Sequence, residues 1–569
     1  MARWLVLAAL IACQPRHGVA LVTTAETSAF QRTGRYDEAV ALCHAFAAHY
    51  DRVTCEQIGT SGEGRPIVAL RIGHGHPLIY VQAGIHAGEI EGKDAGFMFV
   101  RDLLDGKVAP GALAAVDLMF VPCINPDGHE QWSPNNRPNQ RGPAEMGFRS
   151  NGARLNINRD FVKADAPETR AVLGVYRRDD PLVFVDIHTT DGAKFQHDIS
   201  LNLAPVAPRP DGLDRTARAL GDALAARMTA LGHLPVTFYP SFVKDDDPMS
   251  GFAINAAPPR FSQIYAGERS RLGLLVENHS WRSYAERVRS SYHLLQALLE
   301  RAATDAPAWQ AAADAARAAD QRLGGSELPL VYDNGPHTTQ LAFRGYAFDK
   351  RASDVSGGTW IVYDETRPEI WNVPLRDELV PKVVASVPRA GYIVDGGFAA
   401  DVAAVLDRHG IAYTRIAGRP RLDVLAFRAT EVTTLPVFEG RAREQLDGAW
   451  ARETRTLDLG AIFVPIAQPN ARLIVQLLDP GGPDSLAQWG ELASAFERKE
   501  YIEPYVMEQL ARDMMAKDPG LRARFDAALA ADPALAQSPQ QRLDWFYRRS
   551  PVWDERVNLL PIYKVDRAP

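Results

Sequence analysis

Cysteine is scarce in this sequence. The 569 residues include only four cysteines, Cys13, Cys43, Cys55 and Cys123, and no two of them form a CxxC pair. A zinc site built from closely spaced cysteines is therefore excluded. Cys43 and Cys55 are free either to form a disulfide in an oxidising compartment or to remain two unpaired core thiols, and the sequence leaves both alternatives open.

Long runs of apolar residues and of basic residues are also missing. After the first 20 residues no stretch is apolar for long enough to cross a membrane, so we expect no transmembrane helix in the mature chain. The chain lacks a long basic run and carries a net charge of −7, so a nucleic-acid partner is not indicated. At 569 residues it is too long for one ordinary hydrophobic core, which predicts at least two domains.

Residues 1–20 resemble an export signal. Arg3 is followed by a short apolar run at residues 4–12, and Gly18-Val19-Ala20 offers a small-residue cleavage site. The segment ending at Cys13, Leu-Ile-Ala-Cys, also resembles the lipobox of bacterial lipoproteins, with Cys13 as the lipidated residue. Both alternatives predict a periplasmic or extracellular protein, and the second adds a lipid anchor.

The pattern of apolar residues predicts an α/β fold with a mixed central sheet flanked by helices. Segments that are apolar along nearly their whole length alternate with segments of helical periodicity. This order is typical of a sheet that is buried on both faces by helices. We expect strands at residues 68–72, 78–83, 116–121, 182–187 and 272–276, and helices at 36–50, 89–105, 213–231 and 284–302.

The remainder of the chain predicts a second unit. An alanine-rich helix at residues 302–323 places the domain boundary near 305–325, so we expect a first domain at 30–305 and a C-terminal α/β accessory domain at 325–569. Within the second domain we expect strands over 340–364, a β-α-β unit over 392–414 and mostly helix over 484–550. No catalytic signature is visible in this half, and the helical stripe Tyr501, Tyr505, Val506, Leu510 and Met514 is interpreted as packing.

Two histidines and a glutamate follow the predicted buried strands. His86 and Glu89 come directly after the strand at 78–83, and His188 comes after the strand at 182–187. The carboxyl ends of parallel strands open into a common crevice, so these side chains can meet there. Two imidazoles and one carboxylate form a three-ligand zinc site that leaves a position open for water.

Two further features are consistent with a hydrolase. Glu277 ends the strand at 272–276 and is costly to bury without a partner, so it either faces a metal site or pairs at the rim with Arg282 or Arg287. Asn158 and Arg159 are adjacent, and a guanidinium offers parallel donors that match a carboxylate, although a surface loop with ordinary arginines is the alternative.

Taken in order, these motifs resemble those of the zinc carboxypeptidase family. They are His86-x-x-Glu89, Asn125-Pro126-Asp127-Gly128, Asn158-Arg159, Asp186-Ile187-His188 and the strand-ending Glu277, and the resemblance covers about residues 30–305. It implies one Zn²⁺ ion held by His86, Glu89 and His188. It also implies Glu277 as the general base, and Asn158 and Arg159 as the clasp for the substrate's terminal carboxylate.

The family also uses an arginine to polarise the scissile carbonyl and a tyrosine to cap the substrate. Arg137 is the preferred arginine, with Arg141 and Arg149 as alternatives, and Tyr265 is a nearer candidate for the cap than Tyr284. Asp186 is either a partner of a ligand histidine or a structural acid.

The resemblance and the N-terminal segment together predict an exported metallocarboxypeptidase whose substrate is a peptide with a free carboxylate. One alternative keeps the zinc but cleaves N-acyl amino acids or cell-wall peptides, and another is a non-catalytic binding protein.

Overall fold

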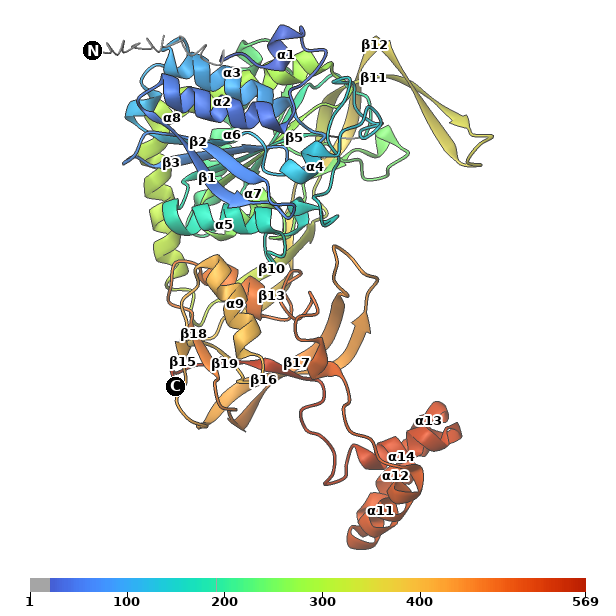
Figure 1. The fold of residues 1–569 in the computed structure, drawn as a ribbon. Helices are drawn as coiled ribbons and strands as arrows, with labels where there is room; N and C mark the ends of the chain where they lie inside the picture. Colours follow the sequence, from blue (N-terminus) through green and yellow to red (C-terminus); the bar gives the residue numbers. More distant parts are fainter. Residues whose placement is uncertain (1–20, 191) are drawn as a thin grey trace, which may run out of the picture.

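The computed structural model describes residues 21–190 and 192–569 (Figure 1). The predicted export signal, the lipobox and Cys13 lie outside the described residues. None of the described helices combines the length and the apolar composition needed to cross a bilayer.

The first half is built around an eight-stranded mixed sheet, in the order β1-β2-β4-β3-β5-β9-β6-β7. Its strands are β1 (Val53–Thr60), β2 (Pro66–Ile72), β3 (Leu78–Ala83), β4 (Asp117–Val121), β5 (Val183–Thr189), β6 (Ile199–Ala204), β7 (Pro235–Val236) and β9 (Leu272–Asn278). The central strands β4, β3, β5 and β9 run parallel, while β2 and β6 join them antiparallel. The predicted mixed central sheet is confirmed.

Helices cover both faces of this sheet, because its inner strands are apolar on both sides. On one face lie α2 (Tyr36–His49), α3 (Glu91–Leu104), α6 (Leu213–Ala230) and α8 (Tyr284–Asp320); on the other lie α5 (Pro167–Asp179) and α7 (Ser262–Glu268). In β3, Ile79 and Val81 pack in the core beneath α2, α3, α6 and α8, while Leu78 and Tyr80 pack in the core beneath α5 and α7. This alternation is the two-residue period of a strand.

Cys43 and Cys55 form a disulfide that joins α2 to β1, so the alternative of two unpaired thiols does not hold. Cys123 is a buried free thiol.

The helix α8 is longer than the helix predicted at 284–302. It continues past Pro307 to Asp320, and Trp309, Ala313 and Ala316 pack in the same core as α3 and α6. The alanine-rich segment is thus part of the first half, and the helix ends inside the range expected for the domain boundary.

The second half contains a six-stranded sheet in the order β15-β18-β14-β19-β16-β17. The strands are β14 (Gly391–Val394), β15 (Thr414–Arg415), β16 (Arg421–Thr434), β17 (Glu444–Thr456), β18 (Ile462–Pro465) and β19 (Leu559–Val565), with helices α9 (Ala399–His409) and α10 (Ala471–Leu478). The predicted β-α-β unit is β14, α9 and β15, but β18 lies between its two strands. A smaller two-stranded sheet is made by β10 (Glu327–Asn334) and β13 (Leu379–Ser386).

One hairpin of the second half lies against the first half. The strands β11 (Thr339–Ala352) and β12 (Thr359–Arg376) form it, and β12 pairs with β8 (Phe252–Ala253). Phe343 and Trp371 of the hairpin pack against Phe195 and Phe238. The hairpin therefore belongs structurally to the first half, although it follows the sequence boundary.

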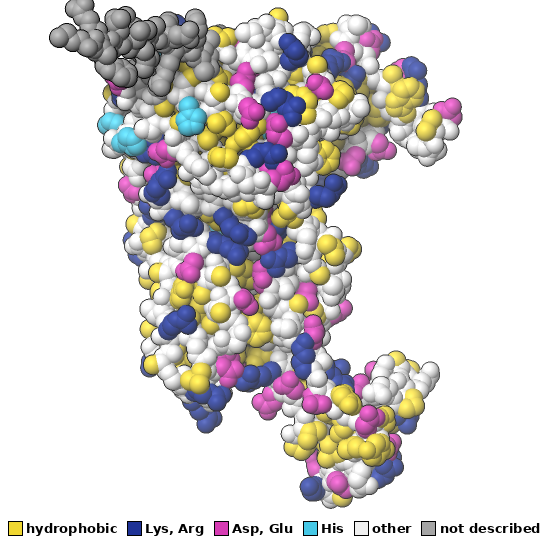
Figure 2. Space-filling model, viewed as in Figure 1, with side chains coloured by type: hydrophobic (Ala, Val, Ile, Leu, Met, Phe, Trp, Pro, Cys, Tyr) yellow, Lys and Arg dark blue, Asp and Glu magenta, His cyan; other side chains and the backbone are white. Residues whose placement is uncertain are grey.

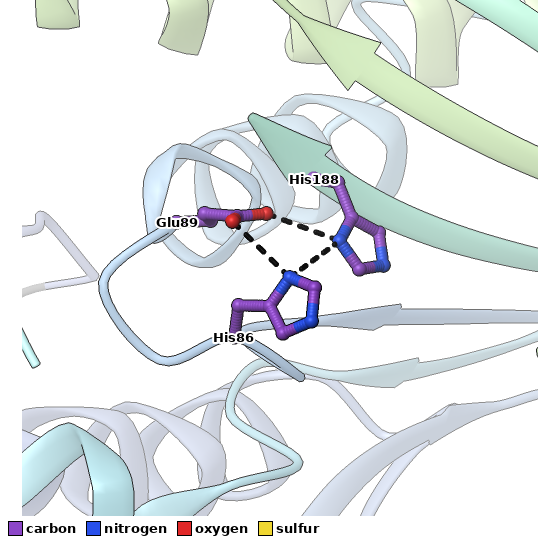
Figure 3. Close-up of side chains that lie close together, drawn as sticks. All are labelled: His86, Glu89 and His188. Carbon is purple, nitrogen blue, oxygen red and sulfur yellow. Dashed lines mark hydrogen bonds and ion pairs between the residues drawn. The ribbon is translucent and has the colours of Figure 1, made fainter. Parts of the chain in front are cut away.

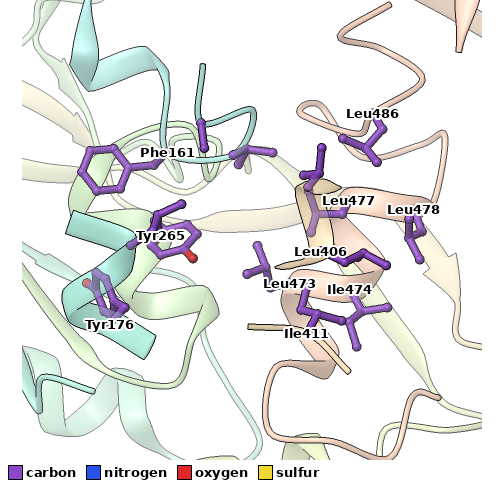
Figure 4. Close-up of a cluster of buried hydrophobic side chains, with 14 of the residues drawn as sticks. Phe161, Tyr176, Tyr265, Leu406, Ile411, Leu473, Ile474, Leu477, Leu478 and Leu486 are labelled. Carbon is purple, nitrogen blue, oxygen red and sulfur yellow. The ribbon is translucent and has the colours of Figure 1, made fainter. Parts of the chain in front are cut away.

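The two halves also share a continuous hydrophobic core. Phe161, Tyr176 and Tyr265 of the first half face Leu406 and Leu473 of the second (Figure 4). Such burial on both sides of the boundary indicates that the two halves form one packed unit rather than two domains on a flexible linker.

A helical appendage projects from the second half. It consists of α11 (Pro504–Lys517), α12 (Pro519–Ala531), α13 (Pro533–Gln537) and α14 (Pro539–Tyr547), and Figure 2 shows apolar side chains on its surface. The predicted packing stripe is wrong in part, because Tyr501 and Tyr505 are 70% and 76% exposed. The helix begins only at Pro504, and its buried side is made by Met507, Leu510, Ala511 and Met514.

Candidate metal centre

His86, Glu89 and His188 converge on one point at the carboxyl ends of β3 and β5 (Figure 3). The Nδ1 atoms of the two histidines are 3.2 Å apart, and the Glu89 carboxylate oxygens lie 3.1 Å from Nδ1 of His86 and 3.0 Å from Nδ1 of His188. All three side chains are buried. The strands are parallel neighbours, which brings the loop after β3 beside the end of β5.

Each of the two histidines has a polar neighbour beside its other ring nitrogen. His86 Nε2 lies 3.0 Å from Asn156 Oδ1, and that oxygen also accepts a hydrogen bond from the Asn158 N–H. Because Asn156 Oδ1 only accepts, the proton of His86 belongs on Nε2, which leaves the Nδ1 lone pair for a cation. His188 Nε2 lies 3.0 Å from Asp186 Oδ2, so the predicted alternative of Asp186 as a histidine partner matches its position.

The sequence interpretation missed Asn156. The one sequence signal for it was its position: Asn156 stands two residues before Asn158, at the start of the turn that carries the expected carboxylate clasp.

Glu277 lies beside the three converging side chains. In the sheet His188 of β5 is paired with Glu277 of β9, so neighbouring strands present both side chains at the same edge. Glu277 is 6% exposed. The two arginines considered as its rim partners have other contacts: Arg287 lies 3.5 Å from Glu91, and Arg282 donates to the Gln196 carbonyl.

A cavity of about 440 Å³ opens onto these residues. Its wall includes His86, Glu89, Asn158, Arg159 and Glu277. Five of the residues singled out from distant parts of the sequence thus line one space.

Asn158 and Arg159 lie on a short 3-10 turn, Ile157–Arg159. The Arg159 guanidinium lies 4.1 Å above the Phe261 ring and donates to the Asn158 carbonyl at 2.7 Å. Within residues 21–190 and 192–569 it forms no ion pair with a carboxylate. Burial lowers the pKa of Arg159, but an arginine remains charged at neutral pH. The cavity wall therefore holds a cation that is available to an anionic ligand.

A comparison with known families supports the same interpretation. Residues 39–241 match the family model described as zinc carboxypeptidase. This segment is a zinc carboxypeptidase domain. It contains His86, Glu89 and His188, and Glu277 follows beyond the end of the match.

Solved structures of this kind resemble about half of the chain. A putative carboxypeptidase A from Shewanella denitrificans is 20% identical, covers 48% of this chain and 69% of its own, and has a TM-score of 0.38. Carboxypeptidase A from Helicoverpa armigera is 16% identical over 49% and 75% of the two chains, with a TM-score of 0.39. A metallo-carboxypeptidase from Pseudomonas aeruginosa is 21% identical over 46% and 68%, with a TM-score of 0.34.

Zinc carboxypeptidases use one zinc ion, and the donor atoms of this domain suit that ion. Two neutral imidazoles and a carboxylate are common zinc ligands. Burial lowers the pKa of His86 to about 4, which favours its neutral form. Burial opposes charge on His188, but the carboxylates of Asp186, Glu89 and Glu277 together outweigh it and raise the pKa of His188, so metal binding there is coupled to loss of a proton.

The candidate arginines of the zinc carboxypeptidase domain occupy different positions. Arg137 Nη2 lies 2.8 Å from Glu89 Oε1, and Arg149 Nη1 lies 3.6 Å from the same oxygen. Arg141 instead pairs at 2.5 Å with Glu365 of the β11–β12 hairpin. Arg137 and Arg149 are thus at the centre, while Arg141 is engaged elsewhere.

The expectation that Tyr265 or Tyr284 caps the substrate is wrong. Tyr265 is fully buried, and its hydroxyl lies 2.8 Å from His409 Nδ1 in the core shared by the two halves. Tyr284 is also buried, where it donates to Asp94. The face of α7 that carries Tyr265 packs against the second half, so this side chain cannot reach the cavity. Tyr239 lines the cavity and is 37% exposed.

Proposed function

We propose that this protein is an exported metallocarboxypeptidase that hydrolyses the C-terminal peptide bond of peptides. The observation that carries the proposal is one cavity lined by two of the candidate metal ligands, His86 and Glu89, by the buried Glu277, and by Arg159, a guanidinium without a carboxylate partner among the described residues. A hydrolase needs the first two groups, and recognition of a free C-terminus needs the third.

Arg159 and Asn158 bind the terminal carboxylate of the substrate. The planar guanidinium offers parallel donors to both carboxylate oxygens, and it is held in place by the Phe261 ring. Asn158 is fixed because its Oδ1 accepts from the Ser262 N–H at 3.1 Å. Binding the carboxylate at this end sets which peptide bond lies at the metal centre.

His86, Glu89 and His188 would hold a zinc ion, which would supply a Lewis acid at the scissile carbonyl and lower the pKa of water. Glu277 accepts a proton from the attacking water and delivers it to the nitrogen of the leaving amino acid. Arg137, or Arg149, which lies in the cavity wall, donates hydrogen bonds to the carbonyl oxygen as negative charge develops there, a contribution of about 3 kcal/mol for one well-placed donor.

The protein acts outside the cytoplasm in this proposal. Residues 1–20 resemble an export signal, and the Cys43–Cys55 disulfide supports an oxidising compartment, because such bonds are rare where thiols are kept reduced. A periplasmic or extracellular location follows, with a lipid anchor if Cys13 is the modified residue.

The substrate is tested with a peptide library incubated with the zinc-loaded protein and read by mass spectrometry. We expect stepwise loss of single residues from free C-termini, while amidated peptides persist. N-acyl amino acids and cell-wall peptides belong in the same library, because the chemistry of the site is also suited to their amide bonds. Loss from N-termini, internal cleavage or no cleavage at all would contradict the proposal.

A further inference from the structure

A loop of the second half reaches the metal centre. Residues 435–443 connect β16 to β17, and Glu439 near the tip accepts a hydrogen bond from the Asn156 N–H through Oε2 at 2.7 Å. The side chain of Asn156 lies 3.0 Å from His86 and accepts from the Asn158 N–H at 3.1 Å. Glu439 therefore contacts Asn156, which in turn contacts both the candidate metal ligand His86 and the carboxylate clasp.

The tip of this loop is held firmly. Arg441 forms two hydrogen bonds to Asp165, at 2.7 and 2.9 Å, and also pairs with Glu491 at 2.8 Å. Phe438 lies parallel to the Trp489 ring, with centroids 6.1 Å apart. These contacts attach the loop to the first half on one side and to the second half on the other.

The backbone of Glu439 is also unusual. Its φ angle is +49°, a left-handed conformation that costs a residue with a side chain about 1 kcal/mol or more. The neighbouring Gly440, at φ +77°, adopts this region without that penalty. A strained residue persists where its surroundings determine its conformation, and here the strained residue is the one that contacts the active-site turn.

The charge of Glu439 acts on the same turn. Burial lowers the pKa of Arg159, and the Glu439 carboxylate opposes that effect without forming an ion pair with the guanidinium. Arg159 therefore has a negative charge nearby but no ion pair with it.

We propose that Glu439 is a positioning residue of the active site, which acts through Asn156 on the metal ligand His86 and on the Asn158–Arg159 turn. The second half of the chain then completes the catalytic unit. The hydrogen bond from the Asn156 N–H fixes the backbone of Asn156, and the Asn156 side chain in turn holds the His86 ring and the start of the turn.

Two conservative variants separate the hydrogen bond from the charge. Glu439→Gln keeps an acceptor oxygen at the same distance along the side chain but removes the charge. Glu439→Asp keeps the charge but withdraws the acceptor by one methylene. Glu431→Gln, at an exposed position of β16, is the matched control.

Zinc affinity is measured by chelator competition. The values of KM and kcat are measured with a peptide that has a free C-terminus. We expect Glu439→Asp to weaken zinc binding and to raise KM, each about tenfold, with kcat changed less, since outer partners of metal ligands typically contribute factors of 10 to 100. Glu439→Gln should stay within about threefold of the unmodified protein, and Glu431→Gln should not differ from it.

The inference rests on the proposed function only for the kinetic measurement. If the unmodified protein binds zinc but cleaves no peptide, the proposed function fails, while the zinc affinities still decide the role of Glu439. Unchanged zinc affinity and KM in Glu439→Asp would overturn the inference, and so would a Glu439→Gln variant as impaired as Glu439→Asp.

Discussion

Replacement of Arg159 by glutamine should abolish preference for a free C-terminus. The guanidinium has one hydrogen bond to the Asn158 carbonyl and no carboxylate partner in the described part of the chain, so its remaining donors are available to a substrate. A hydrogen bond to a charged group contributes about 1.5–3 kcal/mol net. A loss of about 2–3 kcal/mol corresponds to a factor of about 30 to 150 in kcat/KM.

The assay compares two substrates with two proteins. A peptide with a free C-terminus and its amidated form are each given to the unmodified protein and to Arg159→Gln, and kcat/KM is measured below saturation. The unmodified protein should prefer the free carboxylate by about 30- to 150-fold. In Arg159→Gln the preference should fall below about fivefold, because the partner of the carboxylate is gone.

Arg154→Gln is the matched control, since Arg154 is an exposed arginine in the same loop. It should keep the full preference. The reasoning would be refuted if Arg159→Gln slowed both substrates equally, because the guanidinium would then support the fold of the loop rather than bind the carboxylate.

Two further predictions concern stability. Replacing Cys43 and Cys55 together by serine should lower the free energy of unfolding by about 3 kcal/mol in urea titrations. This is the magnitude expected when a disulfide closes a loop of 12 residues in the unfolded chain. An unchanged midpoint would show that the bond does not form in solution. Leu473→Ala, in the fully buried core shared by the halves, should cost about 2–5 kcal/mol and lower the stability of both halves in one transition. Two separate transitions, with only the second half affected, would contradict a common core.

The metal centre was predictable because its residues follow strands. His86, His188 and Glu277 each stand at the carboxyl end of an apolar run, and parallel pairing of β3, β5 and β9 places those ends side by side. Strand pairing therefore converts three distant sequence positions into neighbours.

The contacts made by loops were not predictable. Glu439 meets Asn156 across 283 positions, and no periodicity of the sequence relates the two residues. Tyr265 illustrates a second limit: the sequence suggested it as the substrate cap, because no sequence pattern shows that α7 packs this side chain against the second half of the chain. Tyr505 illustrates a third limit: it stands two residues before Met507 in α11 and so lies on the opposite, exposed side of the helix.

The central claim is that one zinc ion and Glu277 together hydrolyse peptides. The most direct measurement determines zinc content and release of the C-terminal residue in the same preparations of the unmodified protein and of Glu277→Gln. We expect one zinc ion per chain in both, with release reduced by at least about a hundredfold in the variant, the lower end of the range for loss of general-base catalysis. Absence of zinc from the unmodified protein, or undiminished release by Glu277→Gln, would contradict the claim.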